Sequence, residues 1–277
     1  MAAPGASLPV AVFDSGVGGL TVLHECLVSL PQEDYLYLGD TARFPYGDRS
    51  AEELRGFSLE LAEILLAEGA KLLVVACNSA AASALTVLRA ELAGRVPVVA
   101  VVEPESRLAA EATHNGRIGL LGTTATVESG AYERALGRVA PAAELTAVAC
   151  PDLAPLIQSG GEVDERTVAY VESRCAPLLD AGVDTVILGC THYPLVRPVI
   201  QRCLGRGVRI VSSGEAIAAD VENQLRGTSA LAPEGRRGSY RFMCSGDPEA
   251  FRAVGTRFLQ LPLGEVRQVA VRAPVAA

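Results

Sequence analysis

Two stretches of the sequence, residues 72–79 and 185–194, carry a cysteine directly after a run of apolar residues. Such a run is typical of a strand buried in a parallel sheet, so each stretch predicts a thiol at the carboxyl end of a strand. Ligands of these sheets bind in the crevice beyond those ends. Cys77 and Cys190 are therefore predicted to face one ligand from two halves of the chain, as the two thiols of one active site.

The polar residues near the two cysteines indicate the chemistry. Asp14 ends another predicted strand and His192 lies two residues after Cys190, so we expect one polar partner for each thiol. Both cysteines precede predicted helices, and the positive end of a helix lowers a thiol pKa from its usual value of about 8.5. One thiolate could then remove a proton from carbon while the other thiol donates one to the opposite face. This arrangement favours inversion of a carbon centre.

Other interpretations of these residues remain open. A cysteine at a strand end can simply be packed in the core, and an imidazole can cap a helix. Cys190 and His192 could also supply two zinc ligands, but a closed zinc site needs four. His24 and His114 fall in a helical pattern and in a loop, far from the predicted strand ends. We therefore expect no metal.

Two further enzyme classes use the same residue types. A cysteine hydrolase would use Cys190 as nucleophile and His192 as base, but it gives no role to Cys77 or Asp14. Pyridoxal phosphate needs a lysine for its Schiff base, and Lys71 is the only lysine in the sequence. This lysine starts a predicted strand, on the wrong side of the sheet. We therefore expect no cofactor.

The elements that must position these residues are strands and helices in alternation. The predicted strands are residues 10–13, 35–38, 72–77, 98–102, 118–121, 145–149, 185–190, 209–211 and 240–243. Right-handed crossovers through the intervening helices give parallel sheets with helices on both faces. The pattern restarts near residue 104, which predicts an α/β fold of two similar three-layer domains with the active site in the cleft between them. We assign residues 1–103 and 213–277 to the first domain and residues 104–212 to the second.

A glycine-rich loop, residues 14–19, follows the first predicted strand and lets the backbone approach a ligand closely. It lacks the Gly-Lys-Ser/Thr of a Walker loop and the full dinucleotide fingerprint, so it is only a weak signal for phosphate binding. The carboxylate of Asp14, at the tip of the strand, is more informative. Residues 122–126 are a hydroxyl-rich counterpart of this loop in the second half.

Composition restricts the class of protein. The chain has 277 residues, 49% of them hydrophobic and 20% charged, enough for a large core and two domains. A net charge of −8, with no basic tract and 5% aromatic residues, argues against a nucleic-acid groove. The amino end lacks a signal pattern and no apolar run is long enough to span a bilayer, so we expect a cytoplasmic protein without membrane contact.

The seven cysteines show no paired spacing, which indicates reduced thiols. Four of them lie in helical or strand patterns where a free cysteine behaves as a small hydrophobe. We expect these four only to pack: Cys26, Cys175, Cys203 and Cys244.

Five segments in order resemble the signature of the glutamate racemase family: residues 13–19, 46–47, 76–79, 102–104 and 189–194. The resemblance extends from about residue 9 to about residue 260. It implies a cofactor-independent interconversion of L- and D-glutamate, which supplies D-glutamate for peptidoglycan. It also implies that Cys77 is the acid/base for D-glutamate and Cys190 the acid/base for L-glutamate. Asp14 would assist the first thiol and His192 the second.

The same resemblance implies a substrate site and allows a homodimer. Together with backbone amides, the residues expected to hold the carboxylates and the amine of glutamate are Asp14, Ser15, Tyr46, Gly47, Asn78, Ser79, Thr191 and His192.

Three positions depart from the common pattern of that family. Ser79 and Ala81 stand where the family usually has Thr and Ser, which keeps the first hydroxyl and loses the second. Gln158 falls where many relatives carry a glutamate that supports the histidine side of the site, unless Glu162 takes its place. The alternative function is therefore an aspartate racemase or an inactive paralogue.

Overall fold

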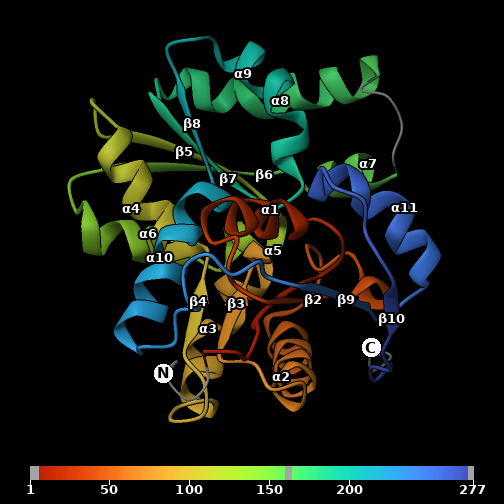
Figure 1. Cartoon of the computed structure of the whole chain (residues 1–277). Coiled ribbons are helices and arrows are strands. Elements are labelled where there is room, and N and C mark those ends of the chain that lie inside the picture. The colour runs from red at the N-terminus through yellow and green to blue at the C-terminus, as the bar shows by residue number, and fades with distance from the viewer. Residues whose placement is uncertain (1–5, 160–163, 274–277) are drawn as a thin grey trace.

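The computed structural model describes residues 6–159 and 164–273, which form two sheets of parallel strands (Figure 1). The first sheet has the strand order β10-β9-β2-β1-β3-β4 and the second the order β6-β5-β7-β8. The strands of the first sheet are β1 (Val10–Asp14), β2 (Tyr35–Gly39), β3 (Leu72–Val75), β4 (Val98–Ala100), β9 (Tyr240–Cys244) and β10 (Val266–Gln268). Those of the second are β5 (Arg117–Gly122), β6 (Glu144–Ala149), β7 (Thr185–Gly189) and β8 (Arg209–Ser212). The predicted fold of two α/β domains is confirmed.

Helices connect the strands and cover the sheets. Those of the first half are α1 (Leu20–Ser29), α2 (Ala51–Ala67), α3 (Asn78–Glu91) and α4 (Val102–Ala112). Those that follow are α5 (Thr124–Glu128), α6 (Ala131–Val139), α7 (Leu153–Gln158), α8 (Glu165–Asp180), α9 (Arg197–Leu204), α10 (Ser213–Gly227) and α11 (Pro248–Leu259). Two short 3₁₀ helices, η1 (Thr41–Arg43) and η2 (Tyr193–Val196), lie in loops. In Figure 1, α8 and α9 lie above the second sheet and α4 lies below it.

The central strands are apolar except at their ends, because helices cover both of their faces. Every residue of β1, β3 and β7 is buried. An unbroken apolar strand is the pattern expected of a parallel sheet that water does not reach. Strand β6, by contrast, lies at a sheet edge and is only half-buried. The continuous apolar runs of the sequence therefore mark the middle of each sheet.

Two predicted strands end two residues early, and one strand was not predicted. Strand β3 ends at Val75, two residues before the predicted end at Cys77. Helix α4 begins at Val102, so the predicted strand 98–102 is shorter and its last apolar residues belong to the turn and the helix. The strand β10 has only three residues at the sheet edge, and its Arg267 and Gln268 are exposed. Such a short polar segment carries no strand signal.

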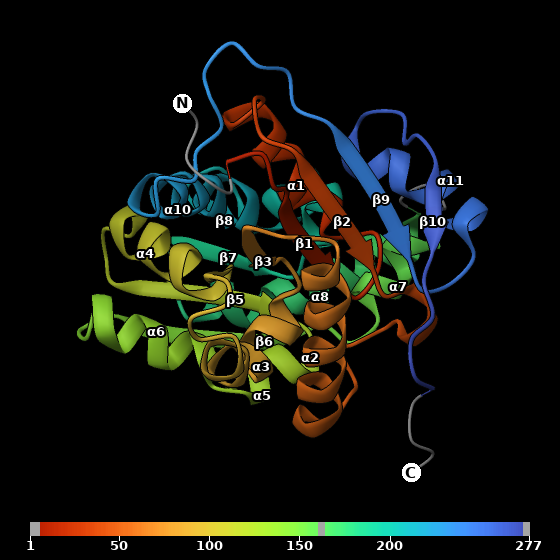
Figure 2. The same ribbon diagram turned by 60° about the horizontal axis from the view of Figure 1, so that its bottom comes forward.

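In each sheet, the register of the strands places their carboxyl ends at the same edge. Asp14 at the end of β1 pairs with Gly39 of β2, and Gly122 at the end of β5 pairs with Gly189 of β7. Strand β9 pairs with β2, so the closing part of the chain joins the first sheet as expected. The domain boundaries at residues 103/104 and 212/213 stay a prediction. Figure 2 shows β1, β2 and β9 side by side in the first sheet.

Within the described ranges, 6–159 and 164–273, no helix combines the length and the apolar character needed to cross a bilayer.

Candidate active site

A small cavity lies where the carboxyl ends of the two sheets meet. It is lined by residues of both halves: Ser15, Phe44, Pro45, Tyr46, Gly47, Cys77, Asn78, Ser79, Thr123, Pro151, Ala154, Pro155, Cys190, Thr191 and His192. The structure thus brings together every residue of the predicted site except Asp14, whose buried side chain lies beside the cavity and contacts Thr191. The cavity has a volume of about 20 Å³, which is room for about one water molecule.

Cys77 and Asp14 occupy the first side of the cavity. Cys77 is the residue before α3 and caps that helix without a side-chain hydrogen bond. The Asp14 carboxylate accepts a hydrogen bond from the Gly16 amide at 2.9 Å and one from the Thr191 hydroxyl at 3.1 Å. The second bond joins the end of β1 to the loop after β7. Burial raises the pKa of Asp14 to about 6, so above that pH the side chain is mostly a carboxylate.

Cys190 and His192 occupy the opposite side. The thiol sulfur of Cys190 lies 3.9 Å from Nδ1 of His192, and Nε2 of the same ring lies 2.9 Å from Oε1 of Gln158. An amide oxygen only accepts, so Nε2 carries the proton and Nδ1 is free to accept one from the thiol. Burial lowers the pKa of His192 to about 3, which keeps the imidazole neutral. Phe44 and Phe258 pack against this ring, at centroid distances of 5.5 and 5.1 Å.

The expected lowering of the thiol pKa values is wrong. Burial raises the pKa of Cys77 to about 12, and the nearby Asp14 charge adds to this effect. The Ala80 backbone amide at the start of α3 lowers it, but by less than burial raises it. Burial also raises the pKa of Cys190 well above its usual range. Cys190 precedes a 3₁₀ turn rather than the first turn of an α-helix, so it lacks the predicted helix end.

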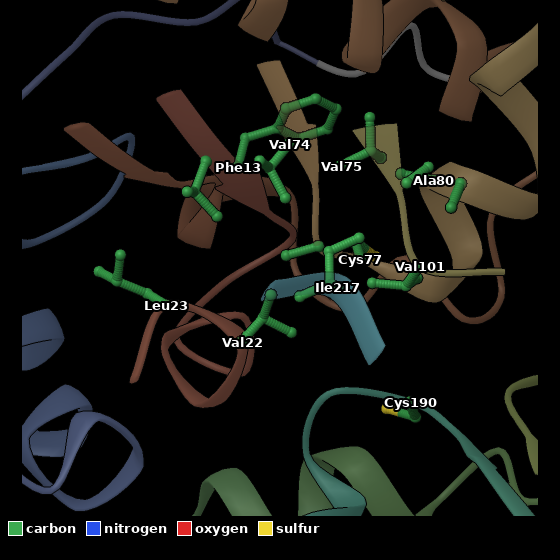
Figure 3. Close-up of a cluster of buried hydrophobic side chains, with 14 of the residues drawn as sticks. Phe13, Val22, Leu23, Val74, Val75, Cys77, Ala80, Val101, Cys190 and Ile217 are labelled. Carbon is green, nitrogen blue, oxygen red and sulfur yellow. The ribbon is translucent and has the colours of Figure 1, made fainter. Parts of the chain in front are cut away.

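Both thiols line the same cavity, where negative charge on Cys77 adds to the raised pKa of Cys190. Figure 3 labels both cysteines, Cys77 at the turn into α3 and Cys190 at the turn after β7. The geometry therefore brings the two predicted thiols to one cavity from two sheets.

The glycine-rich loop, residues 14–19, lies against the second half of the chain. A Cβ at Gly18 would lie 2.3 Å from the Thr191 hydroxyl and 2.4 Å from Nδ1 of His192. Gly19 has no room for a side chain either, since its Cβ would lie 2.6 Å from that of Asp14. Close approach to the facing loop explains Gly18, and close packing against the first half of the chain explains Gly19.

The remaining predicted residues fall into two groups. The Tyr46 hydroxyl donates to the buried Asp40, which also accepts from Arg43 at 2.6 Å. The carbonyl of Gly47 accepts from the Ala125 amide at 2.9 Å, across the two halves. Both residues line the cavity, but their hydrogen bonds are made to protein groups in the ligand-free state.

The hydroxyls of the second half join the site as well. Ser79 Oγ lies 2.8 Å from Oγ1 of Thr123, which donates to Thr126 at 3.0 Å. Sequence reasoning did not assign Thr123 to the site, although the hydroxyl-rich stretch after the strand was a usable signal. Gln158 reaches the imidazole as the resemblance implied, whereas Glu162 lies outside the described residues.

Lys71 lies immediately before β3, at the opposite end of that strand from Cys77, and its ammonium is paired with Glu33. This confirms its expected position at the far side of the sheet. Nδ1 of His24 lies 2.8 Å from the carbonyl oxygen of Leu259. Among the described residues, no three His, Cys, Asp or Glu side chains are grouped as metal ligands.

Two parallel sheets whose strand ends share a cavity with two cysteines define an α/β protein with an acid/base site for a small molecule. A sequence model of the family described as Asp/Glu/Hydantoin racemase matches residues 20–221, and the chain belongs to this family. The chain is 46% identical over 266 residues to a glutamate racemase of Geobacter metallireducens, covering 95% of this chain and 97% of the relative. The protein is therefore a racemase.

Solved structures agree with this assignment. The glutamate racemase isoform RacE1 of Bacillus anthracis superposes with a TM-score of 0.89 at 38% identity, covering 97% of this chain and 99% of that one. A glutamate racemase of Francisella tularensis, solved with D-glutamate, gives a TM-score of 0.88 at 29% identity, covering 96% and 98%. An aspartate racemase of Picrophilus torridus, 16% identical with a TM-score of 0.52, shares the fold alone.

Proposed function

We propose that this protein interconverts L- and D-glutamate without a cofactor, using Cys77 and Cys190 as the two acid/base groups. The observation that carries the proposal is the pair of thiols on one small cavity, each with its own polar partner. The similarity to glutamate racemases over nearly the whole chain supports glutamate as the substrate. Aspartate racemisation is the alternative, which only a likeness in fold supports.

The proposed reaction moves one proton on each face of the α-carbon. From D-glutamate, the Cys77 thiolate takes the α-proton while the Cys190 thiol donates its proton to the opposite face. L-glutamate leaves, with Cys77 now a thiol and Cys190 a thiolate. The reverse reaction begins from that state, so Cys190 is the base for L-glutamate.

Each polar partner helps its own thiol to ionise. The carboxylate of Asp14, whose pKa of about 6 leaves it ionised at neutral pH, would receive the proton of Cys77. Nδ1 of His192 is placed to accept the proton of Cys190, because Gln158 holds the ring proton on Nε2. Burial raises the pKa of both thiols, so such assistance is needed before either can act as a base.

Residues of both halves of the chain would position the substrate. Helix α3 begins at Asn78, directly after Cys77, and its positive end stabilises a carboxylate and the negative charge that develops when the α-proton leaves. The other proposed contacts are Ser15, Tyr46, Gly47, Ser79, Thr191 and His192. A dicarboxylate amino acid is much larger than one water molecule, so the walls of the cavity must separate before it enters.

The proposed cellular role is to supply D-glutamate for peptidoglycan in the cytoplasm. A homodimer stays a prediction.

Incubation of the purified protein with L-glutamate, and separately with L-aspartate, in deuterium oxide tests the proposed reaction. We expect D-glutamate carrying deuterium at the α-carbon and a rate from aspartate lower by at least about a hundredfold. Faster conversion of aspartate would support the alternative, and no D-enantiomer from either would refute a racemase of these substrates.

A further inference from the structure

Beside the cavity, side chains from four helices meet at one buried carboxyl group. Glu105 of α4 is fully buried, and its Oε1 accepts from the Ser213 hydroxyl at the start of α10. Its Oε2 accepts from the Tyr132 hydroxyl of α6 and from Nδ2 of Asn78 of α3, the latter at 3.1 Å. Of these four residues, only Asn78 lines the cavity. The cluster therefore connects a cavity residue to groups that no ligand in the cavity would touch.

The two polar ends of the Asn78 side-chain amide differ in their hydrogen bonds. Both of its N–H bonds are occupied, one by Glu105 and one by the Tyr132 oxygen at 2.8 Å. Its Oδ1 is buried and has no hydrogen-bond partner within the described part of the chain. A buried acceptor without a partner is destabilising, because it has lost its hydrogen bonds to water and gained none from the protein. An oxygen left in this state at the edge of a cavity is available to a donor on a ligand.

We propose that Glu105 is a positioning residue that fixes the Asn78 amide with Oδ1, and not Nδ2, toward the substrate, where it accepts a hydrogen bond from the α-ammonium group. This inference rests on the proposed function, because it takes an amino acid as the ligand. The ammonium group offers only donors, whereas the two carboxylates of glutamate offer only acceptors. The orientation of one amide thus decides which group of the substrate is bound at this point.

A carboxyl group at position 105 fixes the amide in both of its protonation states. Burial raises the pKa of Glu105 to about 8, so both states are populated near neutral pH. As a carboxylate, the side chain can only accept. When protonated on Oε1, it can donate to the Ser213 oxygen while Oε2 still accepts from Asn78 and Tyr132. Neither state offers a donor to Asn78, so the Nδ2 group of the amide stays toward Glu105 in both.

The decisive variant is Glu105→Met, which removes the acceptor and keeps much of the volume. The Tyr132 hydroxyl then lacks an acceptor and can donate to Oδ1 of Asn78, which turns Nδ2 toward the cavity. An N–H facing an ammonium group cannot bond it, and a hydrogen bond to a charged group contributes enough that KM for glutamate should rise about tenfold or more. The inhibition constant of glutarate, the same dicarboxylate without an amine, should change less than about twofold.

Two matched variants separate orientation from general damage. Glu105→Gln can keep a carbonyl oxygen toward Asn78 with its own N–H groups toward Ser213, so it should restore KM to within about twofold of the parent value. Glu103→Gln makes the same change two residues earlier on α4, where the side chain pairs with Arg89 at the surface. Glu103→Gln should change neither the KM for glutamate nor the inhibition constant of glutarate.

Should Glu105→Met not fold, the double variant Glu105→Leu with Tyr132→Phe replaces both acceptors of the Asn78 amide by apolar groups and also removes the hydroxyl that Glu105→Met leaves without an acceptor. The same selective rise in KM is expected there. Equal losses for glutamate and glutarate, or an unchanged KM, would overturn the role of Glu105 while the parent protein still racemises glutamate. Absence of racemisation by the parent protein would instead refute the proposed function.

Discussion

Cys77 and Cys190 are both needed if each serves one face of the substrate. Replacing either by Ala removes an acid/base group, and such groups contribute about 10²–10⁴-fold to rates. We therefore expect each single variant to lose racemisation by at least about a hundredfold in kcat/KM, measured from both enantiomers by circular dichroism. The matched variant Cys244→Ala, at the end of β9, should retain activity. A cysteine hydrolase would instead need Cys190 and tolerate loss of Cys77.

The side chain at position 158 affects the pKa of the His192 imidazole, which assists Cys190. A carboxylate at 2.9 Å from Nε2 favours the imidazolium, so Gln158→Glu should raise the pKa of His192 from its lowered value of about 3. If a cationic ring stabilises the Cys190 thiolate, kcat from L-glutamate rises and its pH dependence moves to higher pH. The pKa can be followed by NMR of the ring, with kinetics in both directions.

The overall equilibrium constant limits how the effect of Gln158→Glu can appear. Any gain in kcat/KM must occur in both directions, and only the separate kcat and KM values can differ. An unchanged ring pKa, with unchanged pH profiles from both enantiomers, would show that the contact with Gln158 has no influence on the reaction.

Single residues were predictable where a motif carried them. The cysteines, Asp14 and His192 follow apolar runs, so their place at the strand ends could be read from the sequence. Glu105 could not, because its partners Asn78, Tyr132 and Ser213 lie on three other helices and meet it only in the folded chain. The thiol pKa values were mispredicted because burial outweighs the helix end, and the depth of burial is not visible in a local pattern.

At the level of elements, the loop between β1 and α1 must approach the loop after β7. Gly18→Ala would place a methyl group within 2.4 Å of both Thr191 Oγ1 and His192 Nδ1, so the facing loop has to move. Displacement of catalytic groups by about 1 Å can cost about a hundredfold in rate. We expect a loss of that order in kcat/KM, with the fold retained as judged by circular dichroism.

Gly56 offers a control for Gly18. It lies inside α2, and a Cβ there would meet no atom of the described chain within 4 Å. Gly56→Ala should raise the free energy of unfolding by about 0.5–1 kcal/mol and leave activity unchanged. Equal activity of the two alanine variants would contradict the close approach of the two loops.

Most elements were predictable because each has a strong local signal. Helix α2 begins with a capping box, Ser50 with Glu53, which is a pattern that marks a helix start in a sequence, and Gly69 after that helix has a positive φ. Strand β10 was missed because it has three residues, mostly polar, at a sheet edge. Its place depends on pairing with β9, a contact between distant segments that no local pattern encodes.

At the level of the whole molecule, Lys71 connects three segments of the chain through its ammonium group. Its ammonium donates to Glu33 at 2.5 Å and to the carbonyls of Ala6 and Ala230 at 2.9 and 2.8 Å. Lys71→Met leaves a buried carboxylate without its cation, which should lower the free energy of unfolding by about 3–5 kcal/mol in urea denaturation. Adding Glu33→Leu removes that charge and should recover part of the loss. Single and double variants of equal stability would show that the pair is not coupled.

The central claim is that two different groups move the proton on the two faces of glutamate. Early in a reaction from L-glutamate in deuterium oxide, mass spectrometry of the separated enantiomers follows the α-hydrogen in substrate and product. We predict that D-glutamate carries deuterium while the remaining L-glutamate keeps protium, because Cys190 removes one proton and Cys77 delivers another that has exchanged with solvent. Protium retained in the D-enantiomer, or deuterium entering both enantiomers at equal rates, would indicate a single base and contradict the two-thiol account.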